Sequence, residues 1–333
     1  MGMILGAYLT KGGLDVTLID AWKEHVDAMN RYGAHVIGKV DERVPVRAVT
    51  PDQAQGPYDL IFLMTKQTAN RLVLPEIARL LAPDGTVCTL QNGVPDLAVA
   101  EVVGKSRTVG GIMMWSAAQA GPGTSSLSQD IFHNSVPCFE IGELDGQLTE
   151  RIQTVSQVLR TMAETTVTDR LMDVRWFKVM VNSTISGMST VLGITFYRAL
   201  REEAFVPYSA MIAREAARVC AAAGYSMPEF HGKRPVEVLD FSGEAGLAAC
   251  RQLLEELIPP TDTTGVASML MDLKNGKRET EIEAINGFIC AWGRRCGIAT
   301  PFNDAIVNIV HEIEAGRMTW CEENLNRLPP VRI

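Results

Sequence analysis

Residues 60–64 read Leu-Ile-Phe-Leu-Met, an unbroken run of apolar side chains in an otherwise mixed sequence. Such a run is typical of a strand in a parallel sheet, which is buried on both faces. An amphipathic helical pattern follows at 72–81, and a second buried strand is expected at 85–90. Strands that alternate with helices at this spacing predict an α/β fold with a parallel sheet.

The alternation continues on both sides of these residues. Further helices are expected at 4–10, 25–31, 99–103 and 147–162. Further strands are expected at 15–20, 108–113 and 164–168. Glycines at positions 12, 13 and 33 are the expected stops of the first two helices.

Beyond residue 169 the strand patterns stop. Helical apolar spacing recurs at 171–190, 202–223, 244–257, 264–275, 279–295 and 303–315. We therefore predict two domains, an α/β domain over 1–169 and an all-helical domain over 170–333. The length of 333 residues agrees with about two domains.

The composition is that of an ordinary globular protein, with 47% hydrophobic and 21% charged residues. A net charge of -8 argues against nucleic acid or an anionic membrane as the main partner. No apolar run reaches the ~20 residues of a membrane span. There are 7 cysteines without a CxxC pair, and the 5 histidines are scattered. We therefore expect free thiols in a reducing cytoplasm and no metal site.

The first candidate catalytic residues lie in the stretch Val174-Arg-Trp-Phe-Lys178-Val-Met-Val-Asn182. The apolar spacing is helical, so Lys178 and Asn182 share one face of a largely apolar helix. Glu281 lies in another helix-like stretch. A lysine, an amide and a carboxylate that meet in a cleft could bind a small oxo acid. The lysine would bind its charge and protonate its oxygen.

The start of the chain is compared with a dinucleotide-binding motif, which has a strand, the pattern G-x-G-x-x-G and a helix. The sequence begins inside that helix, and Gly2 fits the third glycine. The first strand and the first two glycines of the motif are absent, so we expect an N-terminally truncated motif. The alternative is that Gly2 is only a terminal residue and the domain binds no dinucleotide.

Asp20 ends the second strand of this motif. A carboxylate there can accept hydrogen bonds from the adenosine ribose and repel a 2′-phosphate, which favours NAD(H). The alternative is an N-cap for the following helix. Lys23, close by in the sequence, could still attract a phosphate.

Several short motifs occur in a fixed order along the chain. They are Gly2-Met-Ile-Leu-Gly-Ala-Tyr-Leu, Thr65-Lys-Gln, Leu90-Gln-Asn-Gly, Trp176-Phe-Lys with Asn182, Ser268-Met-Leu-Met-Asp, Thr280-Glu-Ile-Glu-Ala-Ile-Asn-Gly and Gly297-Ile-Ala-Thr-Pro. Together they resemble the ketopantoate reductase (2-dehydropantoate 2-reductase) family over nearly the whole chain, apart from the absent first strand. Each motif is weak alone, but their joint order and spacing are specific.

The resemblance implies roles for four residues of the helical domain. Lys178 would be the general acid that protonates the substrate carbonyl, and it would also bind the substrate. Asn182 would bind the substrate and Ser268 its carboxylate, while Glu281 would act beside the nicotinamide. Without the resemblance, Lys178 is a surface lysine, Ser268 a helix N-cap and Glu281 part of a solvated helix face.

The resemblance also implies cofactor contacts in the first domain. Lys66 would bind the cofactor, in addition to Gly2 and Asp20 of the dinucleotide-binding motif. Asn92, at the end of a strand, would contact both cofactor and substrate. Without the resemblance, Lys66 and Asn92 could be a solvated charge and a turn residue.

Four residues depart from the family pattern. Ser186 and Phe196 stand where asparagines are expected, and Pro95 stands where glycine is common. Asp20 replaces a frequent arginine that suits NADP. The chemistry is retained, but we expect a less polar substrate pocket, which puts ketopantoate itself in question.

The function that the resemblance implies is reduction of a small 2-oxo acid to a 2-hydroxy acid in an interdomain cleft, within pantothenate biosynthesis. The family implies NADP as the cofactor, whereas Asp20 favours NAD. Two alternatives stay open: a reductase of a bulkier, more apolar 2-oxo acid, and a catalytically idle binding protein of the same family. We expect a small-molecule partner, no nucleic acid and no membrane, with a homodimer as an open option.

Overall fold

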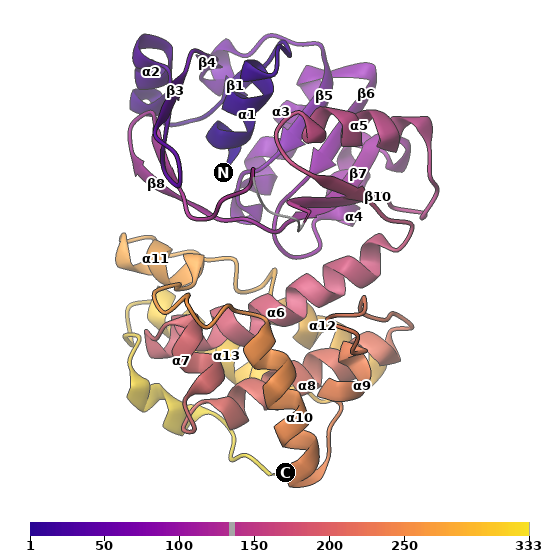
Figure 1. The fold of residues 1–333 in the computed structure, drawn as a ribbon, viewed down its shortest axis with the longest axis vertical. Helices are drawn as coiled ribbons and strands as arrows, with labels where there is room; N and C mark the ends of the chain where they lie inside the picture. Colours follow the sequence, from indigo (N-terminus) through magenta and orange to yellow (C-terminus); the bar gives the residue numbers. More distant parts are fainter. Residues whose placement is uncertain (133–136, 333) are drawn as a thin grey trace. The chain divides into compact units, whose positions relative to one another are not determined.

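The computed structural model describes residues 1–132 and 137–332 (Figure 1). By their contacts these residues form two compact units. The N-terminal unit comprises Met1–Gln91 and Pro95–Leu171, and the C-terminal unit comprises Asn92–Val94 and the residues from Met172 onward. All strands of the described residues lie in the N-terminal unit, and the C-terminal unit is helical, as the sequence predicts.

The N-terminal unit alternates helices and strands. Its α-helices are α1 (Gly2–Lys11), α2 (Lys23–Tyr32), α3 (Asn70–Leu80), α4 (Asp96–Val103) and α5 (Glu150–Arg160). Its strands are β1 (Thr17–Ile19), β2 (Ala34–Gly38), β3 (Glu42–Val44), β4 (Arg47–Val49), β5 (Tyr58–Leu63), β6 (Leu81–Thr89), β7 (Thr108–Met113), β8 (Ala117–Gly121), β9 (Thr124–Leu127), β10 (Phe139–Glu143) and β11 (Thr165–Val167). Short 3-10 helices are η1 (Pro51–Gln53), η2 (Gln67–Ala69) and η3 (Lys105–Arg107). Every helix expected in this half of the sequence is present.

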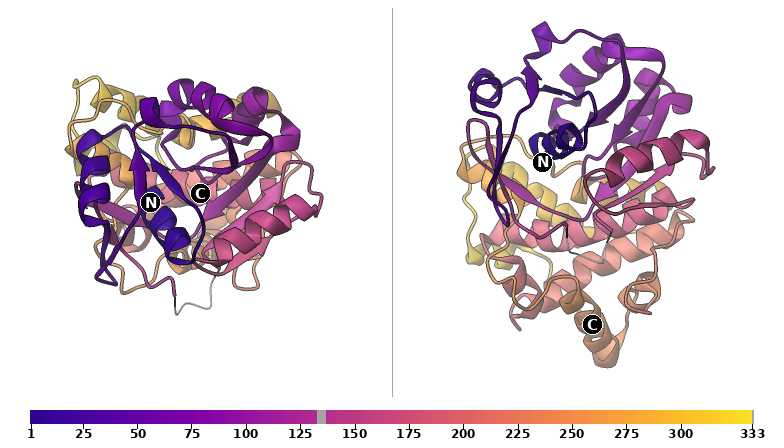
Figure 2. Two further views of the ribbon diagram at one scale, coloured as in Figure 1. Left: turned by 90° about the horizontal axis from the view of Figure 1, so that it is seen from above. Right: turned by 45° about the horizontal axis from the view of Figure 1, so that its top comes forward.

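The strands form three sheets rather than one. In the sheet of order β11-β10-β7-β6-β5, strands β5, β6 and β7 run parallel, and β10 is antiparallel to β7. Strands β1 and β4 form a separate parallel pair. A further sheet, of order β3-β2-β9-β8, packs beside α1 (Figure 2). The α/β class is confirmed, while this last sheet was not anticipated from the sequence.

Strand β5 is less buried than its sequence predicts. Leu63 is buried, but Ile61 and Phe62 are only partly buried. The expectation of burial on both faces is wrong here because β5 lies at the end of its sheet, with β6 as its one paired neighbour. In β6, which lies between two strands, residues 85–89 are all buried, as expected.

The C-terminal unit is built from helices of unequal length. They are α6 (Leu171–Leu192), α7 (Phe196–Arg201), α8 (Val206–Ala222), α9 (Pro235–Leu239), α10 (Gly243–Glu256), α11 (Ser268–Lys274), α12 (Asn286–Cys296), α13 (Pro301–Glu314) and the 3-10 helix η4 (Glu322–Arg327). Helices α7 and α9 are additional to those predicted. Each has six residues or fewer, too short to give a recognisable apolar period.

Helix α6 contributes to two apolar clusters. Its first half gives Trp176 and Val179 to a cluster that includes residues of α8, α10 and α12. Its second half gives Met188 and Val191 to a cluster that includes residues of α11 and α13. These four side chains are fully buried, and each contributes about 1.5–3 kcal/mol to stability by leaving water. Both halves of α6 are therefore fixed by packing.

Glu215 connects α8 to the start of α13. Its carboxylate accepts hydrogen bonds from the backbone N–H of Phe302 at 2.8 Å and of Asn303 at 2.9 Å, and from Asn303 Nδ2 at 2.7 Å. These backbone groups belong to the first turn of α13, which has no helical partner for them. Burial raises the pKa of Glu215 to about 7, although the three hydrogen bonds act to lower it.

The raised pKa of Glu215 predicts a pH-dependent stability. The folded chain keeps a proton on Glu215 that the unfolded chain releases above pH 4.5, so the free energy of unfolding should fall as the pH rises from 4.5 to about 7. The loss should be on the order of 3 kcal/mol. In Glu215→Gln this part of the pH dependence should disappear, as measured by urea unfolding at several pH values. The exposed Glu237→Gln is the control, and an unchanged slope in Glu215→Gln would contradict the prediction.

Candidate functional site

Lys178 lies in the first half of α6, next to the fully buried Val179 and two residues after the fully buried Trp176. The lysine side chain is only partly exposed. Burial lowers the pKa of Lys178 from its usual value. An ammonium group with a lowered pKa gives up its proton more readily, which is the property required of a general acid near neutral pH.

Asn182 follows Lys178 by one helical turn on α6, as its spacing predicts, and it is also partly exposed. The turn that carries the lysine is held by aromatic packing against α12. The Trp176 ring centroid lies 4.9 Å from that of Phe288 and 6.0 Å from that of Trp292. These contacts fix the rotation of α6, and therefore the direction of both polar side chains.

Glu281 is not on a helix, so the helix expected over 279–295 is wrong in its first part. Helix α12 begins only at Asn286, and Glu281 lies in the turn before it, with 4% of its surface exposed. The reason is that side chains take the backbone groups here: the Thr280 N–H bonds to Glu314, and the Ile282 N–H bonds to Thr280 Oγ1. A burial this deep also argues against a solvated helix face.

The start of α12 is connected to α6 through one buried amide. Asn286 Nδ2 donates a hydrogen bond to the backbone oxygen of Ser183 at 3.1 Å and another to Asn303 Oδ1 at 3.0 Å. Ser183 is the neighbour of Asn182 in the chain. A Cβ at Gly187 would lie 3.2 Å from the Asn286 side chain, so the glycine leaves room for this contact.

Ser268 is the first residue of α11 and is exposed. The N-cap position belongs to Ala267, so the alternative that Ser268 is an N-cap is wrong. Because α11 starts with Ser268, its hydroxyl lies on the first turn of a short helix in the C-terminal unit.

Lys66 and Asn92 follow strands β5 and β6. Lys66 is the N-cap residue of η2, and both side chains are partly buried. The residue that holds the strand ends together is Gln91, whose Nε2 donates to Thr65 O at 2.8 Å and to Asn70 Oδ1 at 2.7 Å. The sequence contained Gln91 in a recognised motif but gave no sign of this role, because the bonds join residues far apart in the chain.

The glycines of α1 behave differently from the expectation. A Cβ at Gly2 would meet Met64 at an ordinary 3.7 Å, so packing does not demand glycine there. A Cβ at Gly6 would collide with the side chain of Leu18, on β1. The close approach of helix and strand that the motif requires therefore occurs at Gly6.

Asp20 is exposed at the end of β1. Its Oδ1 accepts a hydrogen bond from the Trp22 N–H at 2.8 Å, which forms an Asx-turn. The N-cap of α2 is Trp22, so the alternative that Asp20 is the N-cap is wrong. The Trp22 ring stacks on His25, with centroids 5.3 Å apart, and this stack helps to hold the turn.

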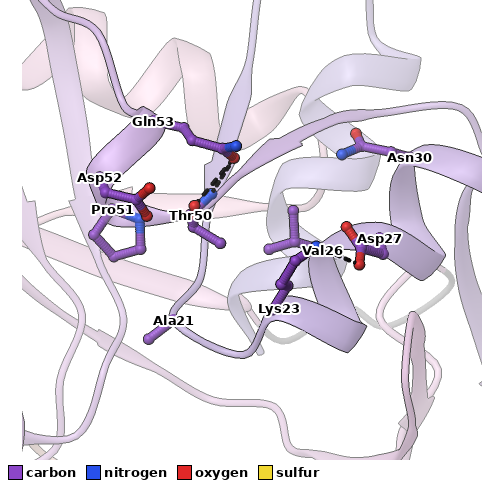
Figure 3. Close-up of a pocket in the computed structure, with 9 residues that line it drawn as sticks. All are labelled: Ala21, Lys23, Val26, Asp27, Asn30, Thr50, Pro51, Asp52 and Gln53. Atoms are coloured by element: carbon purple, nitrogen blue, oxygen red, sulfur yellow. Dashed lines mark hydrogen bonds and ion pairs between the residues drawn. The ribbon is translucent and has the colours of Figure 1, made fainter.

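A surface pocket of ≈ 670 Å³ lies between α2 and η1, near Asp20 (Figure 3). It is lined by Ala21, Lys23, Val26, Asp27, Asn30, Thr50, Pro51, Asp52 and Gln53. Several of its polar groups bond to one another or to the backbone: Lys23 Nζ lies 2.7 Å from Asp27, and Gln53 bonds to Thr50. Lys23 thus forms an exposed ion pair with a carboxylate of its own helix.

Metal-ligand clusters and membrane-spanning helices are features that the described part of the chain would reveal. No group of three or more His, Cys, Asp or Glu side chains there could hold a metal ion. No described helix is both long and apolar enough to cross a membrane.

All 7 cysteines are free thiols, and those at positions 88, 138, 220, 250 and 290 are buried.

Comparison with protein families gives matches to both halves of the chain. The model described as ketopantoate reductase PanE/ApbA matches residues 1–136, and the model of its C-terminal part matches residues 170–314. A 2-dehydropantoate 2-reductase of Streptococcus pyogenes serotype M1 is 26% identical over 317 residues, 95% of each chain. That of Lactococcus lactis subsp. lactis is 28% identical over 324 residues, covering 94% of this chain and 95% of the relative.

Solved structures resemble the chain over nearly its whole length. D-mandelate dehydrogenase with NADH and anilino(oxo)acetate has a TM-score of 0.79 and 25% identity, covering 94% of both chains. A PanE/ApbA family ketopantoate reductase from Ralstonia eutropha JMP134 has a TM-score of 0.75 and covers 94% of this chain and 95% of its own. At 23% identity, this second likeness supports the fold alone.

The lowered pKa of Lys178 can be measured directly. In NMR titrations of the lysine Cε resonances, Lys178 should titrate below 10.5, because burial disfavours the charged form. Lys23 should titrate above 10.5, since its hydrogen bond to Asp27 favours the charged form. Lys178→Arg and Lys23→Arg assign the two signals. A Lys178 midpoint equal to or above that of Lys23 would rule out the expected environment.

Proposed function

Because the chain belongs to the ketopantoate reductase family, we propose that it reduces a small 2-oxo acid to a 2-hydroxy acid with NADPH or NADH. The observation that carries this proposal is the partly buried Lys178, with its lowered pKa, one turn before Asn182 on α6. The curated relatives it matches are named 2-dehydropantoate 2-reductases. 2-Dehydropantoate is therefore the first substrate to test, and its reduction would place the protein in pantothenate biosynthesis.

The reaction needs a proton as well as a hydride. A bound reduced nicotinamide would supply the hydride for the keto carbon. The ammonium group of Lys178 donates the proton to the carbonyl oxygen and stabilises the negative charge that develops there. Asn182 and Ser268 bind the substrate, Ser268 at its carboxylate, and Glu281 acts beside the nicotinamide.

The cofactor contacts are assigned to residues near the start of the chain and at the ends of strands β5 and β6. Gly2, Asp20, Lys66 and Asn92 would hold the dinucleotide. The Asx-turn that orients the Asp20 carboxylate at the end of β1 supports this proposal. We accordingly assign dinucleotide binding to residues 1–169, and substrate binding and catalysis mainly to residues 170–333.

A second candidate substrate is a bulkier, more apolar 2-oxo acid. The likeness to D-mandelate dehydrogenase, solved with an aromatic oxo acid derivative, favours it. So do Ser186 and Phe196, which stand where asparagines of the family pattern are expected. A panel of 2-oxo acids of increasing side-chain size, each assayed with NADH and NADPH, decides between the two candidates. No turnover with any of them would favour a catalytically idle binding protein.

Lys178→Ala should lower kcat by ~10²–10⁴ while cofactor affinity changes little, because the mutation removes the general acid. Lys274→Ala, which removes an exposed lysine at the end of α11, is the matched control and should be near wild type. Steady-state kinetics and calorimetry with the cofactor give the two quantities. A folded Lys178→Ala enzyme with near wild-type kcat would exclude this role.

Asp20 should favour NADH over NADPH, because a carboxylate repels the 2′-phosphate. Asp20→Arg should therefore shift the ratio of kcat/KM values toward NADPH. Asp20→Asn keeps an oxygen for the Trp22 N–H and removes only the charge, so its shift isolates the repulsion. That shift should be roughly threefold to tenfold, the effect of about 1 kcal/mol between charges in water. The ratios are compared at one ionic strength, and equal ratios in wild type and Asp20→Asn would disprove the charge effect.

A further inference from the structure

The turn that carries Glu281 is held from both sides by the last turns of α13. We call residues 280–285 the Glu281 turn; they lie between α11 and α12. The turn has its own backbone hydrogen bonds, from the Ala284 N–H to Glu281 O at 3.0 Å and from the Ile285 N–H to Ile282 O at 3.2 Å. A further bond runs from the Gly287 N–H to Ile282 O at 3.0 Å, and contacts with other elements add to these.

At the start of the turn, Glu314 holds Thr280. One carboxylate oxygen of Glu314 accepts hydrogen bonds from both the backbone N–H and the Oγ1 of Thr280, each at 2.7 Å. The Glu314 side chain is only 12% exposed, so water competes little for these bonds. Thr280 immediately precedes Glu281, and its position sets where the Glu281 backbone begins.

On the other side of Glu281, His311 holds Glu283. Its Nε2 lies 2.7 Å from a carboxylate oxygen of Glu283, and its Nδ1 lies 2.7 Å from the second oxygen of Glu314. A carboxylate at each ring nitrogen favours the imidazolium form of His311, in which both nitrogens donate. Partial burial lowers the pKa of His311, but the bonds to Glu283 and Glu314 raise it by more, so the pKa lies above its usual value.

Apolar anchors and a glycine complete the arrangement. Ile282 and Ile285 are buried in the cluster that contains the second half of α6. A Cβ at Gly287 would collide with the Glu283 carboxylate, so the glycine allows Glu283 to fold back over the start of α12. Thr280, Glu314, His311 and Glu283 thus form one hydrogen-bonded chain around the backbone of Glu281, which we call the clamp.

We propose that Glu314 and His311 are positioning residues that hold Glu281 in its working geometry through the clamp. This inference rests on the proposed function, in which Glu281 acts beside the nicotinamide. Neither residue contacts the reacting atoms. Their effect is on where Glu281 stands, and a misplacement of about 1 Å can cost on the order of 100-fold in rate.

The clamp also makes the geometry depend on pH. Among the described residues, the charged groups bonded to His311 are Glu283 of the turn and Glu314 of its own helix. Arg317, beyond the end of α13, pairs with Glu312 instead. Since the cation is favoured in the folded chain, the clamp is complete below the pKa of His311. As the pH rises through that pKa, one ring N–H is lost and one carboxylate loses its partner.

Glu314→Ala tests the clamp, with Glu312→Gln as the matched control. Glu312 lies on the same helix and also forms an ion pair, but with Arg317. Glu314→Ala should lower kcat by about 10- to 100-fold, with a smaller change in KM for the cofactor, because it misplaces a group at the reacting end. Glu312→Gln should leave both near wild type. Equal kcat values in the folded Glu314→Ala and Glu312→Gln enzymes would overturn the proposal.

His311 variants separate a positioning role from a merely structural one. His311→Lys keeps a cation up to a pH of about 10, so it should remove the loss of kcat that accompanies His311 deprotonation in the wild type. His311→Gln cannot titrate and should show a lower kcat without that pH step. If His311→Lys and wild type have the same pH profile, His311 does not control Glu281.

Hydrogen exchange tests the clamp without relying on activity. In Glu314→Ala, the amides of residues 280–285 should exchange faster than in Glu312→Gln, whereas those of α12 should not. If the wild type reduces no 2-oxo acid, the proposed function fails but this measurement still tests the clamp. If Glu314→Ala exchanges faster but keeps its kcat, Glu314 does not position Glu281 for catalysis. If its exchange is unchanged, the clamp does not hold the turn. If Glu314→Ala does not fold, Thr280→Val removes the two hydrogen bonds of Thr280 Oγ1, the one to Glu314 and the one from the Ile282 N–H, and the same readings apply.

Discussion

A buried chain of polar side chains sets the arrangement of the helices in the C-terminal unit. Glu215 of α8 bonds to Asn303 of α13, Asn303 to Asn286 of α12, and Asn286 to the backbone of α6 at Ser183. Apolar packing alone tolerates small slides and rotations of helices. Buried polar groups do not, because each one left without a partner costs about 1–3 kcal/mol. The chain therefore selects one register among four helices.

The candidate catalytic residues depend on this register. Lys178 and Asn182 stand on α6, and Glu281 stands just before α12. A shift of α12 along α6 would break the bond from Asn286 to Ser183 before it moved Glu281 far from its place. The buried hydrogen bond between α12 and α6 therefore also holds the candidate catalytic residues of these two segments in position.

The sequence predicts the fold class well because that class follows from local periodicity. The 22-residue α6 and the parallel strands β6 and β7 repeat a simple apolar pattern over enough residues to be recognised. Strands β3 and β4 have three residues each and contain charged side chains, so they lack the apolar, β-branched pattern that marks the equally short β1. The burial of β5 was mispredicted because an apolar run does not reveal whether a strand lies inside a sheet or at its end.

The site was predictable only where its geometry is local. The spacing of Lys178 and Asn182 defines a shared helix face without any tertiary information. The sequence predicts a helix at Glu281 because its neighbours have helical propensity, whereas Glu314, which takes the Thr280 N–H, belongs to another element. Gln91 and Gly6 owe their roles to contacts with residues distant in the chain or on another element, which one sequence does not display.

The membership of α6 in two apolar clusters has a consequence for how the C-terminal unit unfolds. Neither cluster can lose this helix without exposing the side chains that it gives to the other. Partial opening of one cluster would therefore uncover apolar surface in both, which makes it nearly as costly as complete unfolding. The two clusters should behave as a single cooperative folding unit rather than as two that open independently.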